Sequence, residues 1–309
     1  MDVFRSAGEI PSPPAPRAVA LGNFDGLHLG HRRIVERLKK GAAALEIPAC
    51  VLTFSPHPER VFGAARLRML QTLDQRLRGL CEWGLDAVFV WPFNRAFAGL
   101  EGRTFAAEIL AARLNARLVV VGDDFRFGRD RSAGPADLAR FGRACGFAVR
   151  AVPRLKRGGR IVGSSRVRDL LAAGRVEDAA LLLGRPYSIE GDVVAGDGIG
   201  RTLGYPTANI RTPNEILPPG IFVTLLECRG RRYQSVSSIG IRPTFGKRDL
   251  AVECHLLDVR RGLYGAPVRL VFLRKLRAER KFRDAAALRS RIAADAEAAR
   301  AYFRRRPHL

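Results

Sequence analysis

Residues 18–38 read AVALGNFDGLHLGHRRIVERL, and this stretch decides how the first part of the chain folds. Its first four residues are apolar, as in a buried parallel strand. Turn-forming residues follow Gly22, and a helical pattern begins soon after them. The stretch therefore predicts a strand, a tight turn and a helix. The apolar residues expected on one face of that helix are Ile34, Val35, Leu38, Ala42 and Leu45.

Two histidines mark the start of this predicted helix. His28 and His31 are three residues apart, so they project on the same side. A helix N-terminus favours phosphate, and imidazoles can donate hydrogen bonds to phosphate oxygens and stabilise transition-state charge. The pattern favours a nucleotide site. A metal-binding pair, for which no third ligand follows on the helix, and a purely structural helix cap are the alternatives.

The turn itself carries a family resemblance. GNFDGLHLGH at residues 22–31 resembles the GNFDGxHxGH motif of the bacterial bifunctional riboflavin kinase/FMN adenylyltransferases, the FAD synthetases. The HxGH part is shared with the wider nucleotidyltransferase superfamily, whereas the longer form is more specific. The resemblance implies that ATP is bound here, and the residues it assigns to nucleotide binding are Gly22, Asn23, Phe24, Asp25 and Gly30.

Length and composition limit the number of domains and the class of protein. Its 309 residues are enough for two domains, and 47% hydrophobic with 27% charged residues is typical of a soluble globular protein. Neither a membrane-length apolar run nor a secretory signal is present, so residues 1–16 are predicted to be a flexible arm. The five scattered cysteines form no CxxC pair, which predicts reduced thiols and a cytoplasmic location.

The formal net charge of +23 predicts attraction to anions, including nucleotides and, non-specifically, nucleic acid or acidic lipid. Aromatic residues do not interleave with the basic ones as in a base-stacking groove. A solvated, arginine-rich surface is favoured, with no specific nucleic-acid or membrane partner. The sequence leaves the oligomeric state open.

Strand and helix patterns alternate through the first half of the chain. This alternation predicts an α/β domain with a parallel sheet, and in such sheets ligands sit beyond the carboxyl ends of the strands. The expected strands after the first are residues 49–54, 87–91, 117–121 and 147–152. The expected helices are residues 71–83, 103–114 and 135–145.

Two loops after predicted strands could contact substrate. TFSPHP at residues 53–58 is stiffened by two prolines and displays His57. GDDFRFG at residues 122–128 combines Asp123 and Asp124 with Phe125 and Phe127, which suit a flavin ring with polar groups at its edge. An acidic turn with Phe125 in the core is the alternative. Both loops resemble the TFxPHP and GxDFRFG segments of the family, which implies flavin binding.

The last motif of the first half is VGSSRVR at residues 162–168, before an amphipathic helix. Its hydroxyls, helix-start N–H groups and Arg166 can grip a polyphosphate, although a serine here could also simply cap the helix. The family usually reads ISSTRIR, so Gly163 replaces a serine and Ser165 replaces a threonine. The resemblance implies nucleotide binding by Ser164 and Ser165, and transition-state stabilisation by Arg166 with the two histidines.

The pattern changes near residue 184, which sets the expected domains at residues 17–183 and 184–309. Short β-rich runs without intervening helices predict an antiparallel sheet or small closed barrel. These runs are residues 187–194, 221–228, 234–239, 251–259 and 268–276, and a final helix is expected over residues 285–303.

A glycine-rich stretch, GDGIGRTLGYPTAN at residues 196–209, carries the chemistry of the second half. Its glycines let the backbone approach phosphates, although ligand-free turns would look similar. It fits neither a Rossmann fingerprint nor a Walker loop. In an extended segment Thr207 and Asn209 point to one side, where their oxygens can complete a magnesium shell that also holds nucleotide phosphates.

This stretch resembles the GRTLGxPTAN motif of riboflavin kinases, and matches at residues 217–220, 238–245, 252–255 and 263–265 follow in order. The resemblance implies nucleotide contacts from Gly200 and Arg201. It also implies that Glu253 is the base that deprotonates the ribityl 5′-hydroxyl. By itself, Glu253 could equally be an exposed strand residue. His255 should share its face and is assigned no role.

Together these motifs imply an enzyme with two magnesium-dependent steps. The C-terminal barrel would phosphorylate riboflavin with ATP, and the N-terminal domain would join the resulting FMN to AMP, giving FAD and pyrophosphate. A riboflavin kinase with a weakened or silent first domain is the alternative that VGSSRVR leaves open. A nucleic-acid-binding or regulatory flavoprotein is a second alternative, motivated by the charge.

Overall fold

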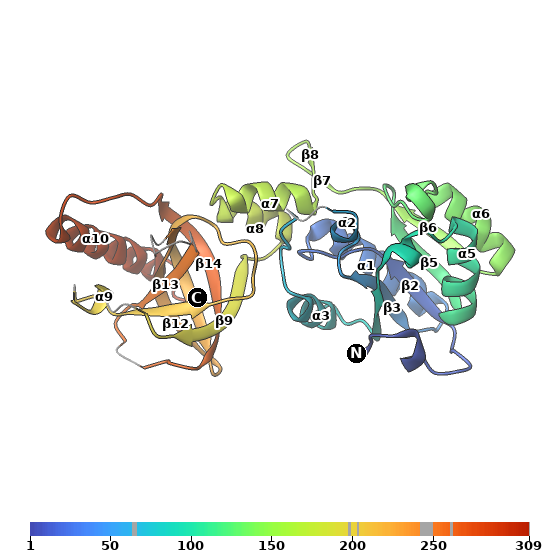
Figure 1. Ribbon diagram of the computed structural model, residues 1–309, viewed down its shortest axis with the longest axis horizontal. Helices are drawn as coiled ribbons and strands as arrows, with labels where there is room; N and C mark the ends of the chain where they lie inside the picture. The colour runs from blue at the N-terminus through green and yellow to red at the C-terminus, as the bar shows by residue number, and fades with distance from the viewer. Residues whose placement is uncertain (64–66, 197–198, 203, 242–249, 260–261, 309) are drawn as a thin grey trace. The chain divides into compact units, whose positions relative to one another are not determined.

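The computed structural model describes residues 1–63, 67–196, 199–202, 204–241, 250–259 and 262–308. The chain divides into two compact units (Figure 1). The first comprises Met1–Arg68 and Thr72–Ser164, and the second comprises Met69–Gln71 and Ser165–Leu309.

The helices α7 (Ser164–Ala172) and α8 (Val176–Leu183) group with the second unit, ahead of the boundary expected at residue 184. Lys275 of the barrel strand β14 explains this, because its side chain donates to the carbonyl of Ala173 (3.1 Å) and its N–H to Glu177 (3.1 Å). Sequence periodicity assigns a helix but does not show which sheet it packs against.

A parallel sheet forms the centre of the first unit, as the sequence predicts. Within the described residues it has six strands in the order β1-β4-β3-β2-β5-β6. The strands are β1 (Asp2–Phe4), β2 (Arg17–Leu21), β3 (Ala49–Ser55), β4 (Ala87–Pro92), β5 (Ala116–Gly122) and β6 (Ala148–Val152).

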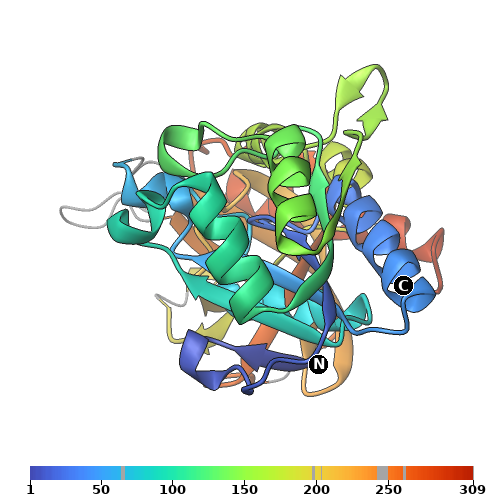
Figure 2. The same cartoon turned by 90° about the vertical axis from the view of Figure 1, so that its right-hand side faces the viewer.

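Helices cover both faces of this sheet (Figure 2). Ala18 and Ala20 face one core, with Val35 and Leu38 of α1 (Leu29–Ala44) and residues of α3 (Leu73–Glu82). Val19 and Leu21 face the other core, with the π-helix η2 (Phe105–Arg113) and α6 (Pro135–Cys145). The alternation follows from the two-residue period of a strand. The shorter elements are η1 (Ala7–Glu9), α2 (Pro58–Val61), α4 (Arg95–Ala98), α5 (Gly102–Thr104), η3 (Arg129–Arg131) and the hairpin β7 (Lys156–Arg157) with β8 (Arg160–Ile161).

The N-terminal residues differ from the flexible arm expected over residues 1–16. Strand β1 pairs with β4, Phe4 stacks on Phe89 with ring centroids 5.1 Å apart, and Ile10 is buried. These residues are ordered because the backbone groups at the edge of β4 pair with β1. Sequence periodicity cannot show such a pairing in so short a strand. Leu45, expected on the apolar face of α1, is instead exposed where that helix ends.

A closed antiparallel barrel forms the centre of the second unit. In the described part of the chain six strands close in the order β10-β13-β12-β11-β14-β9. Strand β10 had been expected only as an extended segment. The elements are β9 (Ser188–Val194), α9 (Ile199–Thr202), β10 (Thr207–Arg211), β11 (Gly220–Cys228), β12 (Arg231–Ile241), β13 (Leu250–Leu256), β14 (Pro267–Arg277) and α10 (Ala285–Arg304).

The final helix α10 packs against the barrel through an apolar stripe and one buried ion pair. Ala296, Ala299 and Phe303 contribute to a core shared with β11 and β14. Arg277 of β14 donates three hydrogen bonds to Asp295 of α10, at 2.7, 2.9 and 3.2 Å. Their side chains are only 14% and 5% exposed, so the buried charge of Arg277 depends on Asp295, which also pairs with Arg291 (3.2 Å).

We expect Asp295→Ala to lower the free energy of unfolding by about 3 kcal/mol or more, because it leaves the Arg277 guanidinium buried without its carboxylate. Urea unfolding followed by circular dichroism measures this loss. Glu297→Ala on the same helix removes a carboxylate that is 59% exposed, so it should lower the free energy of unfolding far less than Asp295→Ala does. Equal losses in the two variants would contradict this account of the pair.

Candidate active sites

The turn between β2 and α1 combines left-handed backbone conformations with buried side chains. Phe24, Gly26 and Leu27 all have left-handed backbones, with φ of 51°, 84° and 45°. This conformation is unfavourable for phenylalanine and leucine. Both side chains are almost fully buried, at 0% and 1% exposure, and this burial holds the turn in place. The side chain of Phe24 therefore belongs to the core, and any nucleotide contact at this residue involves only its backbone.

The two histidines stack at the start of α1. The N–H of His31 donates to Nδ1 of His28 (3.2 Å), and the ring centroids lie 3.6 Å apart with 14° between the planes. His28 thus caps the helix, as one alternative proposed. Because Nδ1 accepts a hydrogen bond, neutral His28 carries its proton on Nε2, the nitrogen that can donate to a phosphate oxygen. The cap and the phosphate-binding role are compatible.

Two small residues complete this corner. A Cβ at Gly30 would lie 3.0 Å from atoms of the His28 ring, so glycine leaves room for the imidazole. The hydroxyl of Ser164 donates to the carbonyl of Asp25 (2.9 Å) and ties residue 164 to the turn. Nothing lies within 4 Å of a Cβ at Gly163, so the position would accept the family's usual serine.

Ser165 and Arg166 follow Ser164 in α7, which groups with the second unit. Ser165 is exposed. The Nη1 atom of Arg166 is buried and has no hydrogen-bond partner among the described residues. Buried guanidinium nitrogens are normally paired, so this atom suits a bound anion.

A cavity of about 650 Å³ lies beside the turn, with Gly22 and Asn23 in its wall. Its size is typical of a ligand site. Phenylalanines form much of its lining: Phe54, Phe62, Phe93, Phe97, Phe105, Phe125 and Phe127. Charged groups also contribute, from Glu59, Asp124, Arg126, Asp130 and Arg131. Such walls suit a flat aromatic ligand with polar groups at its edge.

The residues predicted to bind flavin divide into two groups. Asp124, Phe125 and Phe127 line the cavity. His57 and Asp123 are not among its lining residues. His57 is 7% exposed and accepts the N–H of Glu59 (3.3 Å) as the cap of α2. Asp123 pairs with Arg154 (3.2 Å). Both are occupied by local contacts that motif spacing does not reveal.

Sequence reasoning missed part of this aromatic wall. Phe93 directly follows β4, Phe97 lies in the short helix α4, and Phe62 follows α2. A signal was available, because the loop after the third predicted strand also lies at the carboxyl edge of the sheet.

Arg76 of α3 is a second residue that the sequence did not indicate. It is 4% exposed, and its Nη1 donates to the hydroxyl of Thr53 (3.1 Å) and the carbonyl of Phe54 (3.3 Å). The Thr53 hydroxyl also donates to the carbonyl of Asn23 (3.0 Å). Arg76 therefore stabilises the turn between β2 and α1 through Thr53. Burial lowers the pKa of Arg76, and the nearby charge of Asp25 opposes this shift.

Strand pairing assembles the candidate site of the barrel. In the β10–β13 ladder Asn209 lies opposite Glu253 and Thr207 lies opposite His255. Strand alternation places these four residues on one face, while Cys254 between them is fully buried and its pKa is raised by that burial. The hydroxyl, amide and carboxylate oxygens on this face are the ligand types that a hard divalent cation prefers.

Two glycines make close contacts behind this face. A Cβ at Gly196 would overlap the side-chain amide of Asn209, and one at Gly200 would overlap the carbonyl of Tyr205 and lie 3.2 Å from the Thr207 hydroxyl. This packing explains part of the glycine-rich pattern. The side chain of Arg201 and the motif residues 242–245 lie outside the residues that the structure describes.

These features define a class: an α/β nucleotide-binding domain followed by an antiparallel barrel with a second candidate phosphate site. A family model described as FAD synthetase matches residues 10–166, and one described as riboflavin kinase matches residues 183–303. The chain belongs to the family of bifunctional riboflavin kinase/FMN adenylyltransferases.

Several relatives carry that family name over nearly their full length. The Escherichia coli K12 protein is 35% identical over 307 residues (98% of each chain), and the Bacillus subtilis protein is 33% identical over 305 residues (95% of each). The Pseudomonas fluorescens protein is 37% identical over 283 residues (91% of each). A crystal structure described as a macrolide-efflux protein from Streptococcus pneumoniae is 29% identical, with a TM-score of 0.88 and coverage of 96% of this chain and 98% of its own. In the described part of this chain, no helix combines the length and apolarity that crossing a bilayer requires.

We expect Arg76→Met to lower kcat/KM of FMN adenylylation at least tenfold, since a lost hydrogen bond to a charged group is worth about 1.5 kcal/mol or more. Arg76→Lys keeps the positive charge but loses the planar guanidinium that makes several hydrogen bonds. Its kcat/KM should therefore lie between those of the wild type and the Met variant. FAD formation from supplied FMN measures the effect. Both tryptophans, Trp83 and Trp91, lie in this unit, so their fluorescence verifies its fold. Unchanged kinetics in a folded Met variant would refute the supporting role.

We expect Gly196→Ala to reduce riboflavin phosphorylation about tenfold or more, because the added Cβ displaces Asn209. Adenylylation of supplied FMN should be unchanged. Gly262→Ala is the matched control, since nothing lies within 4 Å of its Cβ and the glycine lies in the same unit. Equal kinase activity in both variants would show that the contact with Asn209 is unimportant.

Proposed function

We propose that residues 17–183 adenylylate FMN and residues 184–309 phosphorylate riboflavin, each through the residues described above. The protein is a bifunctional enzyme of flavin cofactor synthesis, which makes FMN from riboflavin and ATP and then FAD from FMN and a second ATP. One observation supports the residue assignment: in each unit, the groups proposed to act together lie next to one another. The aromatic cavity shares Gly22 and Asn23 with the histidine-capped turn, and Glu253 lies opposite Asn209.

In the adenylyl transfer, the cavity would hold the flavin ring while an oxygen of the FMN phosphate attacks the α-phosphorus of ATP. The bond from that phosphorus to the pyrophosphate oxygen breaks as the new bond forms. His28, through Nε2–H, together with His31 and Arg166 would stabilise the charge that develops on the phosphoryl oxygens and on the leaving pyrophosphate. The partnerless Nη1 of Arg166 supports this assignment.

In the kinase reaction, Glu253 would take the proton of the ribityl 5′-hydroxyl while that oxygen attacks the γ-phosphorus of ATP and ADP leaves. Thr207 and Asn209 would hold a divalent cation together with the nucleotide phosphates, and we propose that this cation is Mg²⁺. When bound, Mg²⁺ would neutralise phosphate charge. The same oxygen-rich face would orient the nucleotide toward the riboflavin hydroxyl.

We also place the enzyme in the cytoplasm. All five cysteines lie in the described chain and are free, as expected in a reducing compartment. The net charge of +23 would favour capture of anionic nucleotides and flavin phosphates by long-range attraction, without a dedicated nucleic-acid surface.

The direct test is to incubate purified protein with riboflavin, ATP and Mg²⁺ and to separate the flavins by chromatography over time. FMN followed by FAD is the expected result. FMN alone would support the alternative of a kinase with a silent first unit. Unchanged riboflavin would overturn the kinase assignment.

Two substitutions should separate the reactions. We expect Glu253→Gln to abolish FMN formation, because the amide cannot accept the hydroxyl proton, while supplied FMN is still converted to FAD. His28→Ala should do the reverse, since it removes the phosphate donor and the helix cap. Rates of each step with supplied substrates measure both effects. Loss of both reactions in either folded variant would disprove this division of labour.

A further inference from the structure

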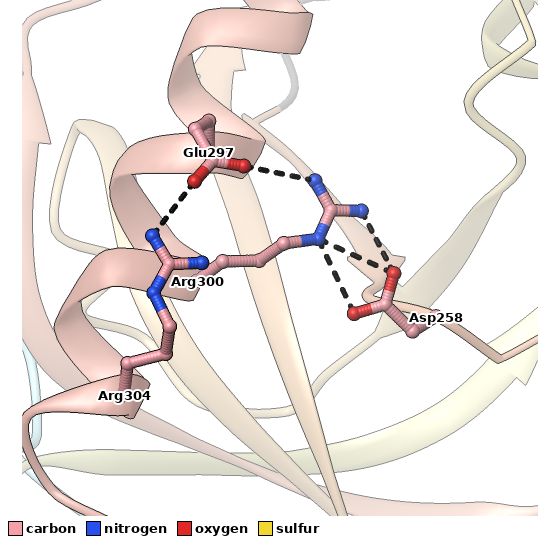
Figure 3. A network of polar contacts seen from close by, with 4 residues as sticks. All are labelled: Asp258, Glu297, Arg300 and Arg304. Atoms are coloured by element: carbon pink, nitrogen blue, oxygen red, sulfur yellow. Dashed lines mark hydrogen bonds and ion pairs between the residues drawn. The ribbon is translucent and has the colours of Figure 1, made fainter.

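A short ion-pair network connects the C-terminal helix with the end of strand β13 (Figure 3). The guanidinium of Arg300 on α10 donates to both oxygens of Asp258, at 2.9 Å from Nη2 and 3.2 Å from Nε. Asp258 follows two residues after the end of β13 and has a left-handed backbone with φ of 57°. The two-point contact therefore fixes a turn that leads directly out of the strand carrying Glu253.

A second contact lies within the same strand pair. Nδ1 of His255 and the carbonyl oxygen of Pro206 are 2.9 Å apart. Because a carbonyl can only accept, the imidazole donates from Nδ1. Pro206 immediately precedes Thr207, so this hydrogen bond holds the start of β10 next to β13. The ring of Tyr205 meets His255 edge-on, with centroids 5.3 Å apart, and limits its rotation.

Asp258 lies three residues after His255 in the same segment of chain. Its pair with Arg300 therefore ties the end of the strand that carries His255 to α10. The same hydrogen bonds from Arg300 hold the pKa of Asp258 below its ordinary value. One end of this segment is thus held by α10, and His255 holds the backbone beside Thr207.

We propose that His255 is a positioning residue of the kinase site, and that α10 stabilises its position through Arg300 and Asp258. His255 holds the carbonyl of Pro206, and this contact sets where the Thr207 hydroxyl lies relative to Glu253 on the neighbouring strand. The helix therefore contributes to the placement of the nucleotide-binding strand as well as covering the barrel. This inference rests on the proposed roles of Thr207 and Glu253.

The test compares two substitutions of His255 in the full-length protein. His255→Leu removes the donor, and we expect kcat/KM for ATP in riboflavin phosphorylation to fall about tenfold, the equivalent of one hydrogen bond. Both a higher KM for ATP and a lower kcat should contribute. His255→Asn presents an amide N–H near the position of Nδ1 and should recover most of the activity. The thermal midpoint of each variant verifies folding.

Either of two results would overturn the role of His255. One is wild-type kinase kinetics in the Leu variant. The other is an Asn variant as impaired as the Leu variant, which would mean that ring packing, and not the hydrogen bond, is what matters. Adenylylation of supplied FMN, measured in the same preparations, should not change.

The contribution of α10 has its own matched pair. Arg300→Met removes the contact with Asp258, and we expect a two- to fivefold loss of kinase kcat/KM for ATP, as for the loss of an exposed ion pair. Arg304→Met removes only the pair of Arg304 with Glu297 (2.8 Å), one turn further along the helix, and should leave kinase activity unchanged. Equal activities of the two variants would overturn the role of the helix.

The control Glu253→Gln separates this inference from the proposed function. If Glu253→Gln abolishes the kinase reaction and His255→Leu does not weaken it, the catalytic assignment holds and only the positioning role falls. If Glu253→Gln remains active, the kinase assignment on which the inference rests falls with it.

Discussion

Strand register is the constraint on which both candidate sites depend. Backbone hydrogen bonds fix which residues lie opposite each other, and the two-residue pleat fixes the face on which each side chain appears. In the barrel this brings Asn209 against Glu253, and a shift by one residue would bring Cys254 to the outer face in place of Glu253. In the first unit, parallel pairing aligns the carboxyl ends of β2 and β3, so that the histidine turn and the Thr53 loop meet at one edge.

The unfavourable features of the first site are buried together. Phe24 and Leu27 accept left-handed backbones inside the core, and Arg76 keeps a charge almost out of contact with water. Each of these would be costly alone. Their contacts support one another. The buried side chains of Phe24 and Leu27 hold the turn in the core, and hydrogen bonds from Arg76 to Thr53 and from Thr53 to Asn23 also hold it. A turn held by contacts on both sides suits a reaction that depends mainly on positioning and charge.

The sequence predicted much of the architecture and the centre of each site. The α/β domain, the antiparallel barrel and the final helix are confirmed. Thr207 and Asn209 share one side of β10, and Asn209 lies opposite Glu253. The predictions were least complete where a residue acts through distant contacts. Arg76 lies on an ordinary amphipathic helix, and His57 resembles an exposed loop residue although it is buried. Strand β1 is too short for periodicity to indicate it.

The sequence by itself determined most of the long helices and strands, where the glycine-rich and histidine motifs lie, and which family they resemble. These properties are local, because they depend on periodicity, turn chemistry and motif spacing along the chain. Only the tertiary structure decided which phenylalanines line one cavity, which charges are buried, and how Arg300 joins helix α10 to the turn after β13. Those relations join residues far apart in sequence, and they arise from packing and strand pairing, which local patterns do not encode.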